Sequence, residues 1–546
     1  MKIKLFYPIL LTLLLNTPAK PVYFNVLADS NPTTDMTNVS IESGESFDTN
    51  NIFYDDFSSS RLDSNWVVSH RKWGANDNKG VSANNVFLNT KDDKLIIRAL
   101  GNQHLENSTI GGIGGPLSGG AIVLKDTVRP GRFEVRMKTT YRAGICAAFW
   151  TYTEDGNANN HEIDIELPPR SGNTNPFDEV LFTNWVSGNQ TEQSQEKLSY
   201  YLNDGEYHTF AFDWYYSKNH KQIDYFIDGV KLASHKDQRF VPYLPSRLWL
   251  GAWIPNNEGF VGLPNFDTSY MEIDYVKYSP FLNQEAVTLG TALGCGNTSL
   301  EYKIITEKPR YEWISNGTFH SIAKSTSIKT RGYNYTGNVT LSNNHGYLDT
   351  STSGGAKLGK SSSITYKIDS VPPEEKFTFE GNFKGKTTAK LNYFNRSGVL
   401  FDSHNIQLEN TEWDQFTYNF LTPKETYYME MVFETSSDGE VLLDNLSMYM
   451  NDYQENIPDP DPGEGDEGSS SSSSIEEPSS SSSNPTSTGS SVSSSSQSQS
   501  SSEKNDDKNN PNQEFMQNMA HTGVGALAGS AITALIFLIF LLSKKR

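Results

Sequence analysis

The sequence predicts an all-β protein built on a large antiparallel sandwich or jelly roll, with a second, smaller β-sandwich after it. Short runs rich in Val, Ile, Tyr, Phe and Trp alternate with period two, as in residues 94–98, 132–138 and 222–227. Turn signals such as Pro130-Gly131 and Asp228-Gly229 separate such runs. No helical period of apolar residues competes with them, so antiparallel sheets are the natural interpretation.

The length and the charge bound the number of domains and the class of partner. A chain of 546 residues is too long for one ordinary domain, so two or three are expected. The formal charge of −20 argues against nucleic acid or an anionic membrane surface as a partner. We expect a monomer.

The two ends of the chain predict a secreted, surface-anchored protein. Lys2 and Lys4 precede an apolar run over 5–15, and small residues follow, which predicts a signal peptide over 1–28. Residues 524–542 are uncharged and long enough to span a bilayer, and the basic tail 543–546 should stay cytoplasmic. We therefore expect the protein on the extracellular face, anchored to the plasma membrane.

A wall anchor is the alternative to a membrane anchor. Thr522-Gly523 resembles a degenerate bacterial cell-wall sorting signal, but the usual leucine-proline pair is missing. A plain membrane anchor is therefore favoured.

Between these ends the composition predicts five segments. Residues 29–50 are polar, 51–280 form the large sandwich, 281–309 connect, and 310–450 form the second β-rich block. Residues 451–520 hold Pro-Asp repeats and long Ser runs, which bury too little apolar surface to fold and predict an extended stalk.

The two cysteines leave the redox state open. Cys146 lies in an apolar strand, where a buried free thiol is the commoner case, and Cys295 lies in a Gly-rich connector. A bridge between them is the alternative.

The run 161–166, His-Glu-Ile-Asp-Ile-Glu, is the strongest candidate for chemistry. Side chains alternate faces in a strand, so Glu162, Asp164 and Glu166 share one face while Ile163 and Ile165 share the other. Three carboxylates in one row repel one another, which raises at least one pKa. A sequence selected for stability alone would avoid that row.

Glycoside hydrolysis uses such a pair, one carboxylate as nucleophile and one protonated carboxyl as general acid. Retaining enzymes hold the two carboxyls about 5–5.5 Å apart. In an ideal strand the Cα atoms of Glu162 and Glu166 are roughly 13 Å apart, so their side chains must lean inward across Asp164, which is well placed to bond Glu162. Acidic alternation alone favours a solvated outer face by roughly two to one. A Ca²⁺ site is a further alternative.

Over nearly all of residues 51–280 the chain resembles family 16 of the glycoside hydrolases. Its signature Glu-x-Asp-x-Glu stands here in the unbulged form at 162–166. The strand 144–153, Gly-Ile-Cys-Ala-Ala-Phe-Trp-Thr-Tyr-Thr, resembles the strand that precedes the signature in lichenases. Further matches follow in order at 84–86, 94–95, 207–214, 228–230 and 272–278.

This resemblance implies a two-sheet jelly roll with an open cleft on its concave face. Glu162 would be the nucleophile, Asp164 its helper and Glu166 the acid/base. The cleft would bind a polysaccharide through aromatic faces and polar side chains. Trp150 and Trp253 match sugar-stacking positions, and Asn184 matches a polar cleft position.

The other tryptophans and one aspartate have weaker assignments. Trp185 and Trp73 are about equally suited to the cleft and to the core. Burial is the better interpretation for Trp66, Trp214 and Trp249. Asp274 matches a residue that binds a structural calcium in some members, so the resemblance implies no required cofactor and at most a structural Ca²⁺.

Several positions depart from the lichenase pattern. Ala121 and Val123 replace an acidic and a basic side chain, and Gly251 replaces an asparagine. The segment 168–178 also differs. Lichenase specificity is therefore not expected, and the substrate remains a β-glucan or galactan type of glycan.

The second block resembles jelly-roll carbohydrate-binding modules, at 314–319, 411–413 and 443–447. Trp413 is as well suited to the core as to a sugar platform. The leading hypothesis is an endo-acting retaining glycosidase held at the cell surface. A wall-remodelling transglycosylase and a non-catalytic polysaccharide-binding adhesin are the alternatives.

Overall fold

The computed structural model describes residues 46–50, 52–72, 79–154, 160–167, 177–186, 189–282, 302–319, 332–342, 345–347 and 354–451. The expected signal peptide, most of the polar N-terminal segment, the Ser-rich segment and the apolar stretch 524–542 lie outside these residues, as do Trp73 and Cys295. In the part of the chain that the structure describes, no helix is long and apolar enough to cross a membrane.

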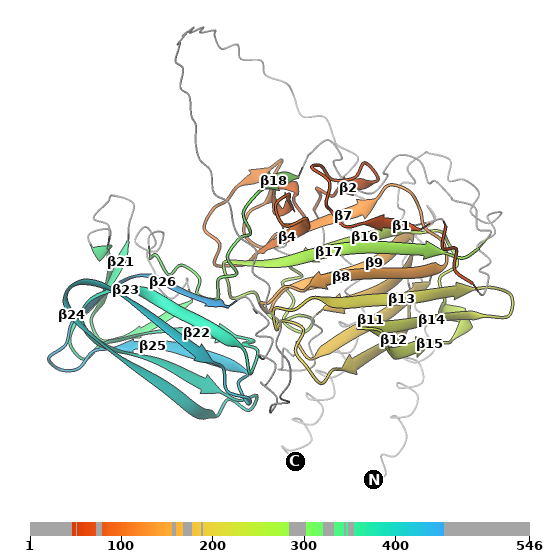
Figure 1. Cartoon of the computed structure of the whole chain (residues 1–546). Coiled ribbons are helices and arrows are strands. Elements are labelled where there is room, and N and C mark those ends of the chain that lie inside the picture. The colour runs from red at the N-terminus through yellow and green to blue at the C-terminus, as the bar shows by residue number, and fades with distance from the viewer. Residues whose placement is uncertain are drawn as a thin grey trace, which may run out of the picture. The chain divides into compact units, whose positions relative to one another are not determined.

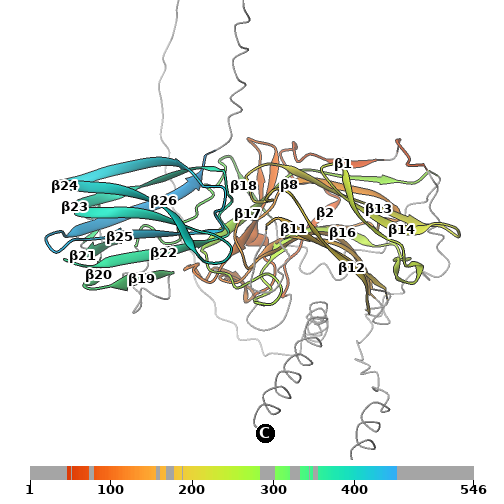
Figure 2. The ribbon, with the colours of Figure 1, turned by 90° about the horizontal axis from the view of Figure 1, so that it is seen from below.

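Two stacked sheets make up the first half of the described chain (Figures 1 and 2). Their strands and short 3-10 helices are β1 (Phe53–Asp55), β2 (Trp66–Val68), η2 (Ala83–Asn85), β3 (Val86–Asn89), β4 (Lys94–Leu100), β7 (Gly120–Leu124), β8 (Gly131–Lys138), β9 (Cys146–Glu154), β10 (Asn160–Leu167), β11 (Glu179–Val186), β12 (Asn189–Lys197), β13 (His208–Tyr216), β14 (Lys221–Ile227), β15 (Val230–His235), η3 (Gln238–Phe240), β16 (Arg247–Trp253), β17 (Thr268–Pro280) and β18 (Lys303–Ile305). A separate two-stranded hairpin joins β5 (Thr109–Ile110) to β6 (Ile113–Gly114).

The order of the strands is that of an antiparallel sandwich. One sheet runs β15-β14-β13-β8-β17-β4-β3-β18, with β1 beside β17. The other runs β12-β11-β10-β9-β16-β7-β2 and holds the carboxylate strand near its middle. Among the described strands of these two sheets, every pair is antiparallel except β18 with β3. The all-β prediction is confirmed.

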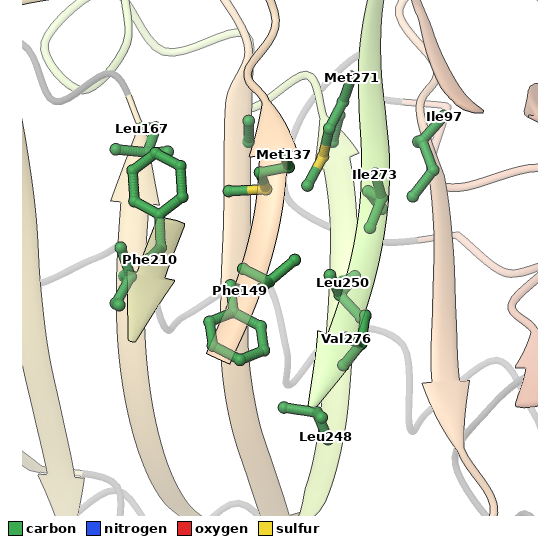
Figure 3. Packing of buried hydrophobic residues seen from close by; sticks show 14 of the residues in the cluster. Ile97, Met137, Phe149, Leu167, Phe210, Leu248, Leu250, Met271, Ile273 and Val276 are labelled. Carbon is green, nitrogen blue, oxygen red and sulfur yellow. The ribbon is translucent and has the colours of Figure 1, made fainter. Parts of the chain in front are cut away.

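The period-two alternation of the sequence produces the core between the sheets. In β8 the burial alternates strictly, with Phe133, Val135 and Met137 fully buried and the residues between them partly exposed. Figure 3 shows how side chains from both sheets meet in this core, among them Met137, Phe149 and Leu250. Burial of such side chains contributes about 1.5–3 kcal/mol each.

The expected turn at Asp228-Gly229 is also present. Both residues have positive φ, 49° and 76°, between Ile227 and Val230, which pair directly. Two consecutive positive φ values define a type I′ turn, which suits Asp-Gly and closes a tight hairpin.

A second β-sandwich follows, with its own apolar core. Its strands are β19 (Tyr333–Thr336), β20 (Val339–Ser342), β21 (Gly355–Leu358), β22 (Ser363–Asp369), β23 (Lys376–Phe394), β24 (Leu400–Leu421), β25 (Tyr428–Glu434) and β26 (Val441–Met450). The long β23 joins its parts, because its first half pairs with β26 and its second half with β25, while β24 runs along its other edge.

Both sandwiches belong to the same compact unit, and a buried arginine links them. Arg142 is 1% exposed, and its Nη1 donates to the backbone oxygen of Trp313 at 2.6 Å. Its Nη2 donates to the backbone oxygen of Asn265 at 3.3 Å. A buried charge of this kind stays in place only where its donors are satisfied.

Candidate active site

Strand β10 presents its three carboxylates on one face, as the sequence predicts. Ile163 and Ile165 are fully buried in the core between the sheets. The opposite face carries Glu162 and Glu166, which are partly exposed, and Asp164, which is 4% exposed. The apolar face therefore anchors the strand while the acidic face is left for chemistry.

Asp164 is the most enclosed of the three. The indole Nε1 of Trp185 donates to its Oδ2 at 3.0 Å, and its other hydrogen bond joins it to Glu162. Burial, followed by the negative charges of Glu162 and Glu166, raises the pKa of Asp164 well above its usual range. The raised pKa favours the protonated form of Asp164, which can donate a hydrogen bond to Glu162.

Glu166 has a different environment at the other end of the row. Burial raises its pKa from 4.5 to about 7, and a hydrogen bond from Cys146 acts in the opposite direction. The Cys146 thiol lies 3.6 Å from Oε1. A carboxyl with a pKa near 7 is protonated in mildly acidic solution and can act as a general acid.

The neighbouring strand β11 places Asn184 and Trp185, two expected site residues, on opposite faces of the sheet. Asn184 lies opposite Ile163 and is fully buried, with Oδ1 bonded to Tyr225 Oη and His235 Nδ1, both at 2.7 Å. It therefore faces the core and not the carboxylates, because the expected cleft position is out of phase by one residue. Trp185, one residue further, is on the carboxylate face.

The tryptophans of β9 and β16 share that face but differ in exposure. Trp150 is 5% exposed and stacks on Trp249, with ring centroids 5.6 Å apart. Trp253 is partly exposed. Sugar stacking stays a prediction for both Trp150 and Trp253, and Trp253 offers more open ring surface. Trp66, Trp214 and Trp249 are buried, as expected.

Several residues of this face were not among the expected site residues, and three of them have chemically active side chains close to the row. They are Cys146 and Tyr152 of β9 and Arg247 of β16. In the strand register Arg247 lies opposite Tyr152, and Tyr152 lies opposite Glu162. Counting back from Trp253 in steps of two reaches Arg247, so the alternation contained this signal.

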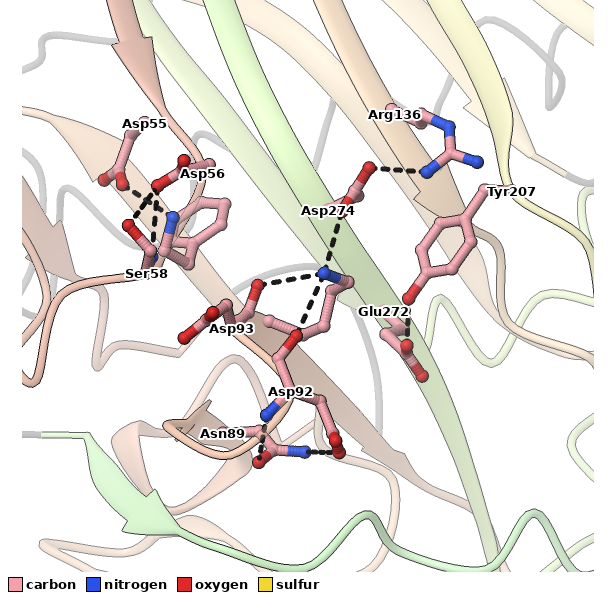
Figure 4. A network of polar contacts seen from close by, with 12 residues as sticks. Asp55, Asp56, Ser58, Asn89, Asp92, Asp93, Arg136, Tyr207, Glu272 and Asp274 are labelled. Atoms are coloured by element: carbon pink, nitrogen blue, oxygen red, sulfur yellow. Dashed lines mark hydrogen bonds and ion pairs between the residues drawn. The ribbon is translucent and has the colours of Figure 1, made fainter. Parts of the chain in front are cut away.

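Asp274 is held by cationic side chains. Its Oδ1 lies 2.8 Å from Lys94 Nζ, and its Oδ2 accepts from Arg136 Nη1 at 2.5 Å (Figure 4). Both oxygens therefore neutralise positive charges, which lower the pKa of Asp274, and these surroundings do not fit Ca²⁺. Among the described residues no group of three or more His, Cys, Asp and Glu side chains is arranged to hold a metal ion.

The cysteine alternatives are partly decided. Cys146 is free and fully buried, and it hydrogen-bonds Glu166 rather than another thiol. Cys295 lies outside the described residues.

The arrangement combines Glu166, whose pKa is raised to about 7, with Glu162, which is hydrogen-bonded to Asp164. One can transfer a proton to a leaving group while the other attacks or stabilises a developing positive charge. Neither step requires a metal ion or an organic cofactor.

Comparisons with known proteins found chains to which this one is similar. A curated β-glucanase of Brevibacillus brevis is 27% identical over 172 residues, which are 30% of this chain and 62% of that protein. The match thus spans less than two thirds of the relative's length. The structure of a β-1,3-1,4-glucanase (lichenase) from a mouse hindgut metagenome covers 42% of this chain and 99% of its own, at 22% identity and a TM-score of 0.35. The Bacillus licheniformis β-glucanase gives the same four values.

Part of the sequence also matches a family model directly. The model of glycosyl hydrolases family 16 matches residues 73–277, which include every strand from β3 to β16 and the whole carboxylate row. Over residues 73–277 the chain is thus similar to glycosyl hydrolases family 16.

Proposed function

We propose that this protein is an endo-acting, retaining glycoside hydrolase that cleaves a β-linked glucan. The observation that carries the proposal is that two glutamates on one face of β10 have different environments. Glu166 has a pKa of about 7, whereas the hydrogen bond from Asp164 favours the charge on Glu162. A double displacement at a sugar carbon needs one protonated carboxyl as acid and one carboxylate as nucleophile, and these two environments suit Glu166 and Glu162 to the two roles.

In this mechanism Glu166 first protonates the glycosidic oxygen as Glu162 attacks the anomeric carbon. The bond to the leaving sugar breaks, and a covalent glycosyl ester forms on Glu162. Glu166, now ionised, takes a proton from water, whose oxygen then displaces Glu162. Two displacements at one carbon retain its configuration. Asp164 orients Glu162 and stabilises its charge through the hydrogen bond between them.

The choice of β-glucan rests on the relatives. The Brevibacillus brevis protein is named a β-glucanase, and the similar structures include laminarinases and lichenases. The departures at Ala121, Val123 and Gly251 argue against strict lichenase specificity, so a β-1,3-linked glucan is the first substrate to test.

Substitution of each glutamate tests the roles separately. Glu162→Gln and Glu166→Gln should each lower turnover of the glucan by about 10² or more. Glu106→Gln is the matched control, because Glu106 is an exposed carboxylate outside this face, and it should leave turnover unchanged. Near-normal turnover in either site variant would contradict the mechanism.

Azide rescue distinguishes nucleophile from acid/base. In Glu162→Ala, azide should occupy the nucleophile's place and yield an α-glycosyl azide. In Glu166→Ala, azide should attack the covalent intermediate and yield a β-glycosyl azide. Exchanged products would reverse the assigned roles, and inversion of the anomeric proton signal during normal hydrolysis would refute retention.

The same experiments separate the alternative functions. Elongation of added acceptor oligosaccharides would identify a transglycosylase. Retarded migration in glucan-containing gels with no released reducing ends would identify a binding protein. Hydrolysis is favoured because a binder has no use for three adjacent carboxyl groups whose mutual repulsion costs stability.

We also propose that the second β-sandwich binds carbohydrate and that the chain is anchored at the cell surface. Tyr347, which is 42% exposed, meets the half-buried Trp413 edge to face at 5.6 Å. An aromatic pair with one exposed ring and one half-buried ring suits the C–H face of a sugar. Trp413→Ala should weaken retardation in glucan gels without changing turnover of a short oligosaccharide. Release of activity from intact cells by protease tests the surface location.

A further inference from the structure

The thiol of Cys146 lies against the candidate acid/base. Cys146 is two residues from Ala148, which pairs with Glu166, so the cysteine is the diagonal neighbour of Glu166 on the same face of the sheet. Its Sγ lies 3.6 Å from Glu166 Oε1, and the cysteine is fully buried. Bulk water therefore does not reach the sulfur side of this carboxyl.

The sulfur has a second partner, which determines the direction of the hydrogen bonds. The side chain of Trp253, whose backbone pairs with Cys146 across β9 and β16, also hydrogen-bonds the thiol. An indole N–H can only donate, so the sulfur accepts from Trp253 and its own S–H donates to Glu166. The thiol stays protonated, because burial and the negative charge of Glu166 raise the pKa of Cys146 well above its usual range.

On the paired strands, the described residues next to Glu166 offer no comparable donor. On its own strand it faces Asp164 and, beyond it, Glu162, which are both acidic. From β11 the opposite residue is Leu181, and from β9 it is Ala148. Of the cations on the described strands of this face, Arg247 lies at the far end of β16, across from Tyr152, and Lys197 lies two strands away on β12.

We propose that Cys146 is a positioning residue for the acid/base, and that its thiol, held by Trp253, fixes Oε1 of Glu166 so that Oε2 exchanges the proton with the glycosidic oxygen and then with water. This inference rests on the proposed hydrolase function. The S–H donor stabilises the carboxylate that forms when Glu166 gives up its proton. Because a thiol is a weaker donor than a hydroxyl, it does so without bringing the acid far below neutral pH.

Three substitutions in the full chain separate this role from simple packing. Cys146→Ser keeps a donor and strengthens it, whereas Cys146→Ala and Cys146→Val both remove it and differ in volume. The pH at the midpoint of the alkaline limb of the kcat/KM profile should be lowest in Cys146→Ser and intermediate in the natural protein. It should be highest in Cys146→Ala and Cys146→Val. kcat should fall roughly tenfold in Ala and Val, with KM little changed, and Ser should recover most of it.

A packing role predicts another order. Suppose that Cys146→Val had the kcat of the natural protein and Cys146→Ser had that of Cys146→Ala. The volume of the side chain rather than its hydrogen bond would then matter, and the proposal would be overturned. Coinciding alkaline limbs in all four proteins would also overturn it. Thermal unfolding of each variant identifies any general loss of structure.

A direct titration keeps this inference separate from the proposed function. If the natural protein released no reducing ends from any β-glucan, the hydrolase proposal would fail. The carbon-13 carboxyl signal of Glu166, identified by its loss in Glu166→Gln, would still report the hydrogen bond. Its midpoint should rise from the natural protein to Cys146→Ala, and an unchanged midpoint would refute the role of the thiol.

Discussion

The indole of Trp185 gives the sharpest test of how the carboxylate row is organised. Trp185→Phe keeps an aromatic ring on the same face but removes the N–H that donates to Asp164 Oδ2 at 3.0 Å. Asp164 is 4% exposed, so bulk water does not replace the lost donor. Without it, Asp164 loses the contact that turns its proton toward Glu162.

The magnitude follows from the burial. A buried acceptor left without its donor costs about 1–3 kcal/mol, and each kcal/mol lowers Tm by about 2–4 °C in a domain of this size. If the same energy is lost from the transition state, kcat falls by roughly 5- to 150-fold. KM should change little, because the ring remains on the carboxylate face.

Trp214→Phe is the matched control. Trp214 is fully buried, and its Nε1 donates to the backbone oxygen of Pro242 at 2.9 Å, away from the carboxylates. It should lose stability by a similar amount and keep its kcat. Steady-state kinetics on a β-glucan and thermal unfolding measure both quantities. A Trp185→Phe protein that loses stability but keeps full kcat would refute the positioning of Asp164 by the indole.

Three further predictions concern pH, the link between the sandwiches and the calcium alternative. Activity should fall as the pH rises through about 7, where Glu166 loses its proton, and a profile flat to pH 9 would contradict this. Because the pKa of Glu166 is raised on folding, its ionisation lowers stability between pH 4.5 and about 7, so Glu166→Gln should have a higher Tm than the natural protein at pH 8. Arg142→Ala should destabilise the protein by about 2–4 kcal/mol in calorimetry, whereas Arg239→Ala, at a side chain 75% exposed, should have no measurable effect. Asp274→Asn should cost less than about 1 kcal/mol, and EDTA should leave Tm unchanged; a lower Tm in EDTA would restore a calcium site.

Much of the fold was predictable because its cause is local. The alternation in β8 and β14 gave the right strands, and Asp228-Gly229 gave the right turn, since side-chain direction and positive φ depend on a few adjacent residues. The placement of Asn184 was wrong by one residue. In a strand a shift of one position exchanges the core face for the cleft face, and resemblance between short motifs does not resolve such a shift.

By itself the sequence determined that Glu162, Asp164 and Glu166 share one face of a strand backed by buried isoleucines, because the period of a strand is two. Only the tertiary structure decided that the pKa values of Asp164 and Glu166 are raised. The groups that decide this come from other strands, with Cys146 20 residues before Glu166 and Trp185 21 residues after Asp164. A pKa depends on burial and on such donors, and both exist only once β9, β10 and β11 are paired.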